Sequence, residues 1–75
     1  MGGLIKRSFT LAGHRTSVAL EVEFWDALVR LADRRGQSLS ALVAAADAGR
    51  APESPLASVL RVMALVTADE RAPRM

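Results

Sequence analysis

The chain has 75 residues, no cysteine and a single histidine, so disulfides and clusters of cysteine and histidine ligands are excluded as sources of stability. Hydrophobic residues make up 51% of the sequence, aromatic residues only 4%, and the mean hydropathy is +0.20. A domain of this size buries only about 60% of the surface of its unfolded chain. The composition therefore predicts an aliphatic core and apolar surface that meets a second copy of the chain.

Positive charge is concentrated in the N-terminal segment, although the net charge is only +2. Lys6, Arg7 and Arg15, together with His14, precede the first acidic residue. All eight carboxylates lie from Glu21 onward. A polyanion is therefore the expected partner of the N-terminal segment.

The sequence also carries indications of where the protein works. The absence of cysteine fits a reducing compartment. Residues 1–11 lack the continuous apolar run of a signal peptide, and the longest apolar stretch, residues 62–66, is too short to span a bilayer. We expect a cytoplasmic protein without a membrane partner, associated with the nucleoid if it binds DNA.

The first third of the chain favours strands. Residues 1–6, with two adjacent glycines, are expected to form a flexible arm that precedes a domain over residues 7–68. Two runs with a period of two residues follow, over residues 8–11 and 15–20, and Gly13 between them indicates a turn.

Side chains alternate between the two faces of a strand. In the second run one face therefore packs, and consists of Thr16, Val18 and Leu20. The opposite face looks outward, and consists of Arg15, Ser17 and Ala19. A lone strand cannot satisfy its backbone groups, so we expect it to pair with its own mate from a second subunit. Additional pairing with residues 8–11, which would give a four-stranded dimer sheet, remains open.

From about residue 22 the apolar period becomes helical. A first helix carries an apolar stripe and closes with two arginines and a capping glycine: Phe24, Trp25, Leu28, Leu31 and Ala32, then Arg34, Arg35 and Gly36. Ser38 is a natural N-cap for a second helix, which Gly49 ends. This helix has an apolar side formed by Leu39, Leu42, Val43 and Ala46.

Ser54 and Pro55 predict the start of a third helix. Its main apolar stripe consists of Leu56, Val59, Leu60, Met63 and Val66. Because Val62 and Leu65 lie off this stripe, the helix is apolar around much of its circumference and is expected to be buried on two sides. Residues 69–75 are expected to be a disordered tail.

The order of strand, helix, glycine-containing turn and helix, with basic residues at the strand, resembles the ribbon-helix-helix domains of Arc- and MetJ-type repressors. The resemblance covers roughly residues 15–48. The segments KRS at residues 6–8 and GHRTS at 13–17, with Phe24 and Trp25 after Leu20 and Glu21, resemble more narrowly a bacterial subgroup of that family. The implied fold class is mainly α with a short β-ribbon, a ribbon-helix-helix homodimer with an additional C-terminal helix.

The resemblance implies a transcriptional repressor or regulator that lays a β-ribbon into the major groove of double-stranded DNA. The implied base-reading residues are Arg15, Ser17 and Ala19. Phosphates would be contacted by the amino end of the second helix, at Ser38, Leu39 and Ser40, and by Lys6, Arg7 and His14. The dimer core would consist of Thr16, Val18, Leu20, Trp25, Leu28, Leu39, Leu42 and Val43.

Each of these residues also has a simpler interpretation. Without the family resemblance, an arginine at the start of a strand, such as Arg15, is a solvated charge more often than a base reader. Ser38 is an N-cap under either interpretation. Lys6 and Arg7 would serve equally well on a solubilising arm. Trp25, at helical spacing, favours a core position over a platform for stacked bases.

No pattern in the sequence indicates an enzyme. His14 has no second histidine or cysteine at ligand spacing, and the chain carries neither a nucleophile and base pair nor a glycine-rich phosphate loop. The acidic residues at the start of the first helix are the ones its dipole favours. We therefore expect no enzymatic activity, no cofactor and no metal.

A second function of a different class is a protein-interaction module, as in an antitoxin or adaptor. The apolar third helix would then bind a partner protein, and Ala19 is a poor reader of bases. Under the first hypothesis that helix instead covers the core of the mate.

Overall fold

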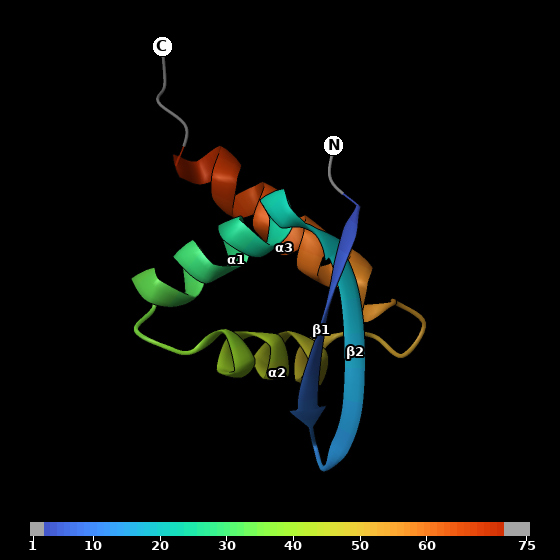
Figure 1. Cartoon of the computed structure of the whole chain (residues 1–75). Helices are drawn as coiled ribbons and strands as arrows, with labels where there is room; N and C mark the ends of the chain where they lie inside the picture. The colour runs from blue at the N-terminus through green and yellow to red at the C-terminus, as the bar shows by residue number, and fades with distance from the viewer. Residues whose placement is uncertain (1–2, 72–75) are drawn as a thin grey trace.

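The computed structural model describes residues 3–71, with side chains over residues 3–67. It contains a two-stranded antiparallel β-ribbon followed by three helices, which confirms the predicted fold class (Figure 1). The elements are β1 (Leu4–Leu11), β2 (His14–Glu21), α1 (Val22–Arg34), α2 (Leu39–Gly49) and α3 (Leu56–Arg71).

The ribbon is a hairpin within one chain. β1 pairs with β2 from Leu4 opposite Glu21 to Leu11 opposite His14, so only Ala12 and Gly13 remain in the loop. Both loop residues have positive φ, 52° for Ala12 and 83° for Gly13. This is the pattern of a type I′ turn, whose twist matches that of the strands it joins. The premise that β2 is a lone strand, in need of a mate from a second subunit, is therefore wrong.

The expected flexible arm over residues 1–6 is also wrong where the structure describes it, because β1 begins at Leu4. The indole Nε1 of Trp25 donates a hydrogen bond of 2.8 Å to the carbonyl oxygen of Ile5. The guanidinium of Arg7 lies 5.4 Å from the centroid of the Trp25 ring, in cation–π contact. Through these contacts Trp25 links the start of β1 to α1.

One face of the hairpin packs on the helices, as the alternation predicted. Val18 and Leu20 of β2 are buried, and so are Phe9 and Leu11 of β1. The rings of Phe9 and Trp25 lie 6.0 Å apart at a tilt of 37°. Burial of these four residues leaves the opposite face of the hairpin as the one that is exposed along its length.

The connection between α1 and α2 follows the predicted capping pattern. Gly36, at φ 67°, donates its N–H to the carbonyl oxygen of Asp33, and the N–H of Gln37 donates to Ala32. Together these bonds form a Schellman motif, which requires the left-handed conformation that glycine adopts without strain. The Oγ of Ser38 accepts a hydrogen bond of 3.0 Å from the N–H of Ala41, which confirms Ser38 as the N-cap of α2.

The third helix packs against its own chain, chiefly on α1. Its buried residues are Leu56, Leu60 and Ala64. The opposite side carries large exposed residues, since Val62, Leu65 and Val66 retain 59%, 66% and 50% of their accessible surface. The helix continues to Arg71, so residues 69–71 of the expected tail are helical, and residues 72–75 lie outside the described residues.

Most of the residues assigned to a dimer core are buried within a single chain. These are Val18, Leu20, Trp25, Leu28, Leu42 and Val43, while Thr16 and Leu39 are partly exposed. β1 and α3 cover the surface that a second subunit was expected to cover, and Leu60, fully buried, completes the same core. The small size of the chain therefore does not by itself require a dimer.

The turn offers a direct test of the hairpin. Most L-residues are strained at positive φ, whereas glycine is not and asparagine is strained less. Ala12→Asn is therefore expected to raise the free energy of unfolding by up to about 1 kcal/mol, and Gly13→Ala to lower it by about 1 kcal/mol. Urea denaturation followed by circular dichroism measures both. Destabilisation by Ala12→Asn would contradict the assigned turn.

The packing of α3 is tested by a pair of substitutions on its two sides. Leu60→Ala is expected to cost about 3 kcal/mol, because Leu60 is fully buried. The matched control Val62→Ala, at an exposed valine, should change the free energy of unfolding by less than about 0.5 kcal/mol. Equal effects of the two substitutions would show that α3 does not pack as described.

Candidate functional site

The exposed face of the hairpin brings together side chains from both strands. Residues directly opposite in an antiparallel pair share a face. The register therefore places Lys6 opposite Ala19, Ser8 opposite Ser17, and Thr10 opposite Arg15. We call this set the outer face, and it consists of Lys6, Ser8, Thr10, Arg15, Ser17 and Ala19.

The centre of the outer face is a pair of hydroxyl groups, the Oγ atoms of Ser8 and Ser17, which lie 3.0 Å apart in a hydrogen bond. Lys6 and Arg15 stand at diagonally opposite corners of the face. Ala19 is partly buried and the other five residues are exposed. At about 3.3 Å per residue, the face extends roughly 13 Å along the strands, which corresponds to about four base-pair steps.

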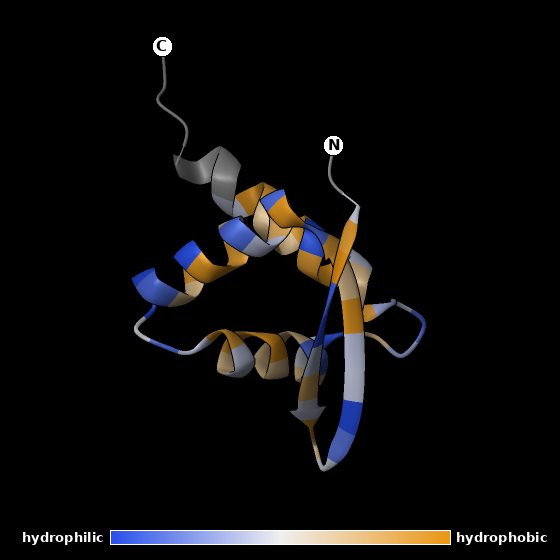
Figure 2. Ribbon diagram, in the orientation of Figure 1, coloured by the Kyte–Doolittle hydropathy of each residue, from blue (hydrophilic) through white to orange (hydrophobic). Residues whose placement is uncertain are grey.

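The hairpin extends beyond the helices at its turn (Figure 1). Hydrophilic segments lie in the middle of β1 and near the turn end of β2, and apolar segments line much of the helices (Figure 2). The outer face is therefore a projecting, polar, positively charged surface that a groove can receive.

Two predicted phosphate contacts lie off the outer face. Arg7 lies on the opposite face by alternation, and its guanidinium is over Trp25. His14 is exposed beside the turn, opposite Leu11, and also has the parity of the packed face. Of the three N-terminal candidates for phosphate contact, only Lys6 shares the face of Arg15.

The carboxylate of Glu21 ends the outer face beside the helices. Its Oε1 accepts a hydrogen bond of 3.2 Å from Nε of Arg61 on α3. A hydrogen bond from its own backbone N–H lowers the pKa of Glu21 below its ordinary value, partial desolvation opposes this, and Arg61 lowers it further. The positive charge of Arg61 offsets the negative charge of Glu21, so the neighbouring outer face keeps its positive character.

The predicted phosphate-binding segment at the start of α2 lies apart from the hairpin. Ser38 caps the helix, Leu39 packs partly against the core and Ser40 is exposed. Figure 1 shows this end of α2 away from the hairpin, while the other end approaches β1. Within one chain, the length of α2 therefore separates Ser38 from the outer face.

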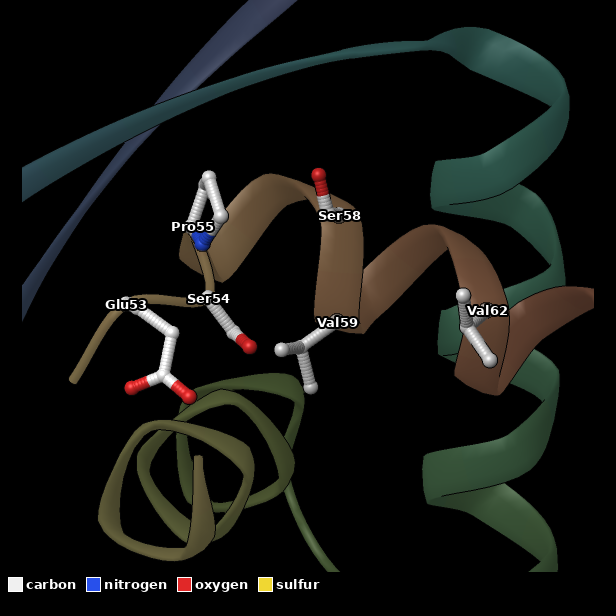
Figure 3. Close-up of a pocket in the computed structure, with 6 residues that line it drawn as sticks. All are labelled: Glu53, Ser54, Pro55, Ser58, Val59 and Val62. Atoms are coloured by element: carbon white, nitrogen blue, oxygen red, sulfur yellow. The ribbon is translucent and has the colours of Figure 1, made fainter. Parts of the chain in front are cut away.

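A hollow of about 360 Å³ lies between the loop before α3 and the first turns of that helix (Figure 3). Its lining consists of Glu53, Ser54, Pro55, Ser58, Val59 and Val62. Only Glu53 in this lining is charged. In the described part of the chain no group of three or more potential metal ligands occurs, and no helix there is long and apolar enough to cross a membrane.

Sequence reasoning found the β2 half of the outer face and missed the β1 half. Ser8 and Thr10 were not assigned a role, and Lys6 was placed on an arm. The alternation of Ile5, Arg7, Phe9 and Leu11 with the residues between them runs through the whole of β1 and could have revealed it.

Comparison with known proteins shows the family of the chain. Residues 4–68 match the sequence model of the ribbon-helix-helix domain. No curated protein and no solved structure matches the chain. Domains of this family generally bind DNA and dimerise.

The lowered pKa of Glu21, caused first by its own backbone N–H and further by Arg61, predicts a pH dependence. Because the folded-state pKa of Glu21 is lowered, its contribution to stability is present above the unfolded-state pKa and is lost as the pH falls through the folded-state value. Arg61→Gln is expected to raise the pKa of Glu21, as measured by NMR titration of the side-chain carboxyl. Arg50→Gln, which removes a different ion pair, with Asp47, is the control and should leave that pKa unchanged. An unshifted pKa in Arg61→Gln would contradict the role of Arg61.

Proposed function

Because the chain belongs to the ribbon-helix-helix family, we propose that it is a sequence-selective DNA-binding regulator, acting as a repressor, that inserts its β-ribbon into the major groove. The observation that carries this proposal is the exposed outer face, where Arg15 and Ser17 point away from a packed core. A two-stranded ribbon fits the major groove, where each base pair presents its own pattern of donors and acceptors.

Arg15 is the principal reader in this proposal. Its guanidinium has the geometry to donate two hydrogen bonds to O6 and N7 of a guanine. Ser17 offers a hydroxyl that donates or accepts, and Ala19 offers only a methyl group for contact with thymine. Selectivity therefore decreases in the order Arg15, Ser17, Ala19.

Phosphate contacts would set the position of the ribbon without reading sequence. The Ser38 hydroxyl is already bonded to the N–H of Ala41, so an anion at this helix start would be held by other free N–H groups there, those of Leu39 and Ser40. Lys6 is placed to follow the backbone beside the ribbon. Arg7 and His14 would reach phosphates only from the edge of the hairpin.

We further propose that the protein is a cytoplasmic bacterial homodimer, associated with the nucleoid when it binds DNA, and that it has no enzymatic activity. Family membership supports the dimer, and so does the apolar surface that one chain leaves exposed. A dimer would place two hairpins on neighbouring half-sites.

The proposal is tested by a salt titration and one charge-matched pair of variants. Affinity for random duplex DNA should fall steeply with salt, because bound phosphates release counterions. Arg15→Ala should abolish the base preference seen in selection from a random pool and weaken binding to the preferred duplex by about tenfold. Arg30→Ala removes an equal charge from an exposed position on α1 and should keep the preference. Absence of duplex binding at low salt would refute the proposed function.

A second candidate function, a protein-interaction module, is favoured by the exposed side of α3, formed by Val62, Leu65 and Val66. Sedimentation measurements on Leu65→Glu distinguish a surface that joins two copies of the chain from one that binds another protein. If the wild-type chain is a dimer and the variant is a monomer, the surface joins two copies of the chain. If the dimer persists, the surface is free for another protein, and the second function gains support.

A further inference from the structure

We infer that the exposed side of α3 is a contact between two copies of this chain, whose helices pack antiparallel with Val62 at the twofold axis. We call this side the α3 stripe, and it consists of Ser58, Val59, Val62, Leu65 and Val66. The inference goes beyond the proposed function, because no residue of the outer face takes part in the contact. A second copy here occupies the surface that the second candidate function leaves to another protein.

The first support is the exposed apolar area at the centre and the C-terminal end of the α3 stripe. Val62, Leu65 and Val66 keep half or more of their accessible surface, although the other side of the helix is buried. Their spacing of three and four residues makes them neighbours on one face of the helix. An exposed cluster of large apolar side chains in so small a domain indicates a contact with another macromolecule.

The second support is the hollow at the N-terminal end of the same stripe. Its lining includes Ser58, Val59 and Val62, and its volume of about 360 Å³ leaves room for large apolar side chains. Figure 3 shows the side chains of Ser54 and Val59 pointing toward each other across the hollow, while Val62 lies farther along α3. The α3 stripe therefore has a recess at one end and projecting apolar side chains at the other.

The third support is the match between these two ends under a twofold rotation. With antiparallel helices and the axis at Val62, Leu65 of one copy faces Val59 of the second copy, and Val66 faces Ser58. Ser58 and Val66 lie four residues before and after Val62, which is about 6 Å along the helix in opposite directions. The projecting side chains of each copy therefore enter the hollow of the other, in the reciprocal pattern of a twofold interface.

The charges around the α3 stripe also favour a second copy. None of its five residues is charged, and Glu53 is the only charged residue in the lining of the hollow. Arg61, beside the stripe, is already paired with Glu21. A partner recognised by opposite charge would find little to bind here, whereas a second copy of the stripe brings no charge to the centre of the contact.

The contact can be tested with a single cysteine, because the chain has none of its own. Packed helices have axes 8–10 Å apart and Cα atoms about 2.3 Å from each axis, so two residues that meet at the twofold axis have Cα atoms roughly 4–6 Å apart. A disulfide bridges this distance. The full chain with Val62→Cys is therefore expected to form disulfide-linked pairs of chains under mild oxidation.

The matched control is Ser40→Cys, at an exposed serine of α2. Val62→Cys should cross-link at least about tenfold faster than this control, because the contact raises the effective concentration of one thiol at the other. Non-reducing electrophoresis follows the linked pairs. The reaction of each cysteine with a small disulfide reagent corrects for differences in intrinsic thiol reactivity. Val62 is exposed, so the variant is expected to fold, and circular dichroism checks this.

A second substitution distinguishes the specific contact from random collision. Val62→Cys with Leu65→Glu places a carboxylate in the apolar hollow of the second copy and should slow cross-linking by about tenfold. Val62→Cys with Leu65→Met keeps an apolar side chain of similar volume and should keep the rate.

Cross-linking of Val62→Cys no faster than that of Ser40→Cys would overturn the inference, and is the result expected if another protein covers the α3 stripe. A rate that Leu65→Glu leaves unchanged would overturn it as well. Binding of the wild-type chain to duplex DNA tests the proposed function separately, so either one can fail while the other stands.

Discussion

The pairing of β1 with β2 inside one chain is the constraint on which the rest of the structure depends. It fixes by alternation which side chains of the hairpin pack and which are exposed. The packed side contributes Phe9 and Leu20 to the core, and Trp25 joins the same core while its Nε1 holds the carbonyl of Ile5. The opposite side carries the polar residues of the outer face, so the fold and the candidate site depend on the same pairing.

The same pairing explains how so small a chain completes its hydrophobic core. A chain of 75 residues without disulfides was expected to complete its core with a second subunit. Here β1 and α3 complete it, and Leu60 is as fully buried as Leu20 and Leu42. Two copies of the chain would therefore associate through surface that is still exposed after one chain has folded. The stability of such a dimer can then differ from the stability of the single chain.

The sequence predicted those elements whose boundaries depend on local chemistry. Ser38 as an N-cap and Gly36 as a C-terminal cap act within a few residues, and the structure confirms both. The partner of a strand is a non-local property, because a run such as residues 15–20 alternates in the same way whether it pairs with β1 or with a second copy. Gly13 indicated a turn, but Ala12 gave no indication of its type, since type I′ turns favour asparagine or glycine at that position. The β1 half of the outer face was missed for these two reasons.

The hairpin also has a consequence for symmetry. A ribbon assembled from two copies of one strand has a twofold axis through its centre, and therefore favours a palindromic sequence beneath it. The outer face has no such axis, because Lys6 and Thr10 on one strand oppose Ala19 and Arg15 on the other, and only the central serines match. The polar groups that one hairpin presents therefore differ between its two ends. A twofold axis between two copies of the chain would relate one whole hairpin to another and would leave each outer face asymmetric.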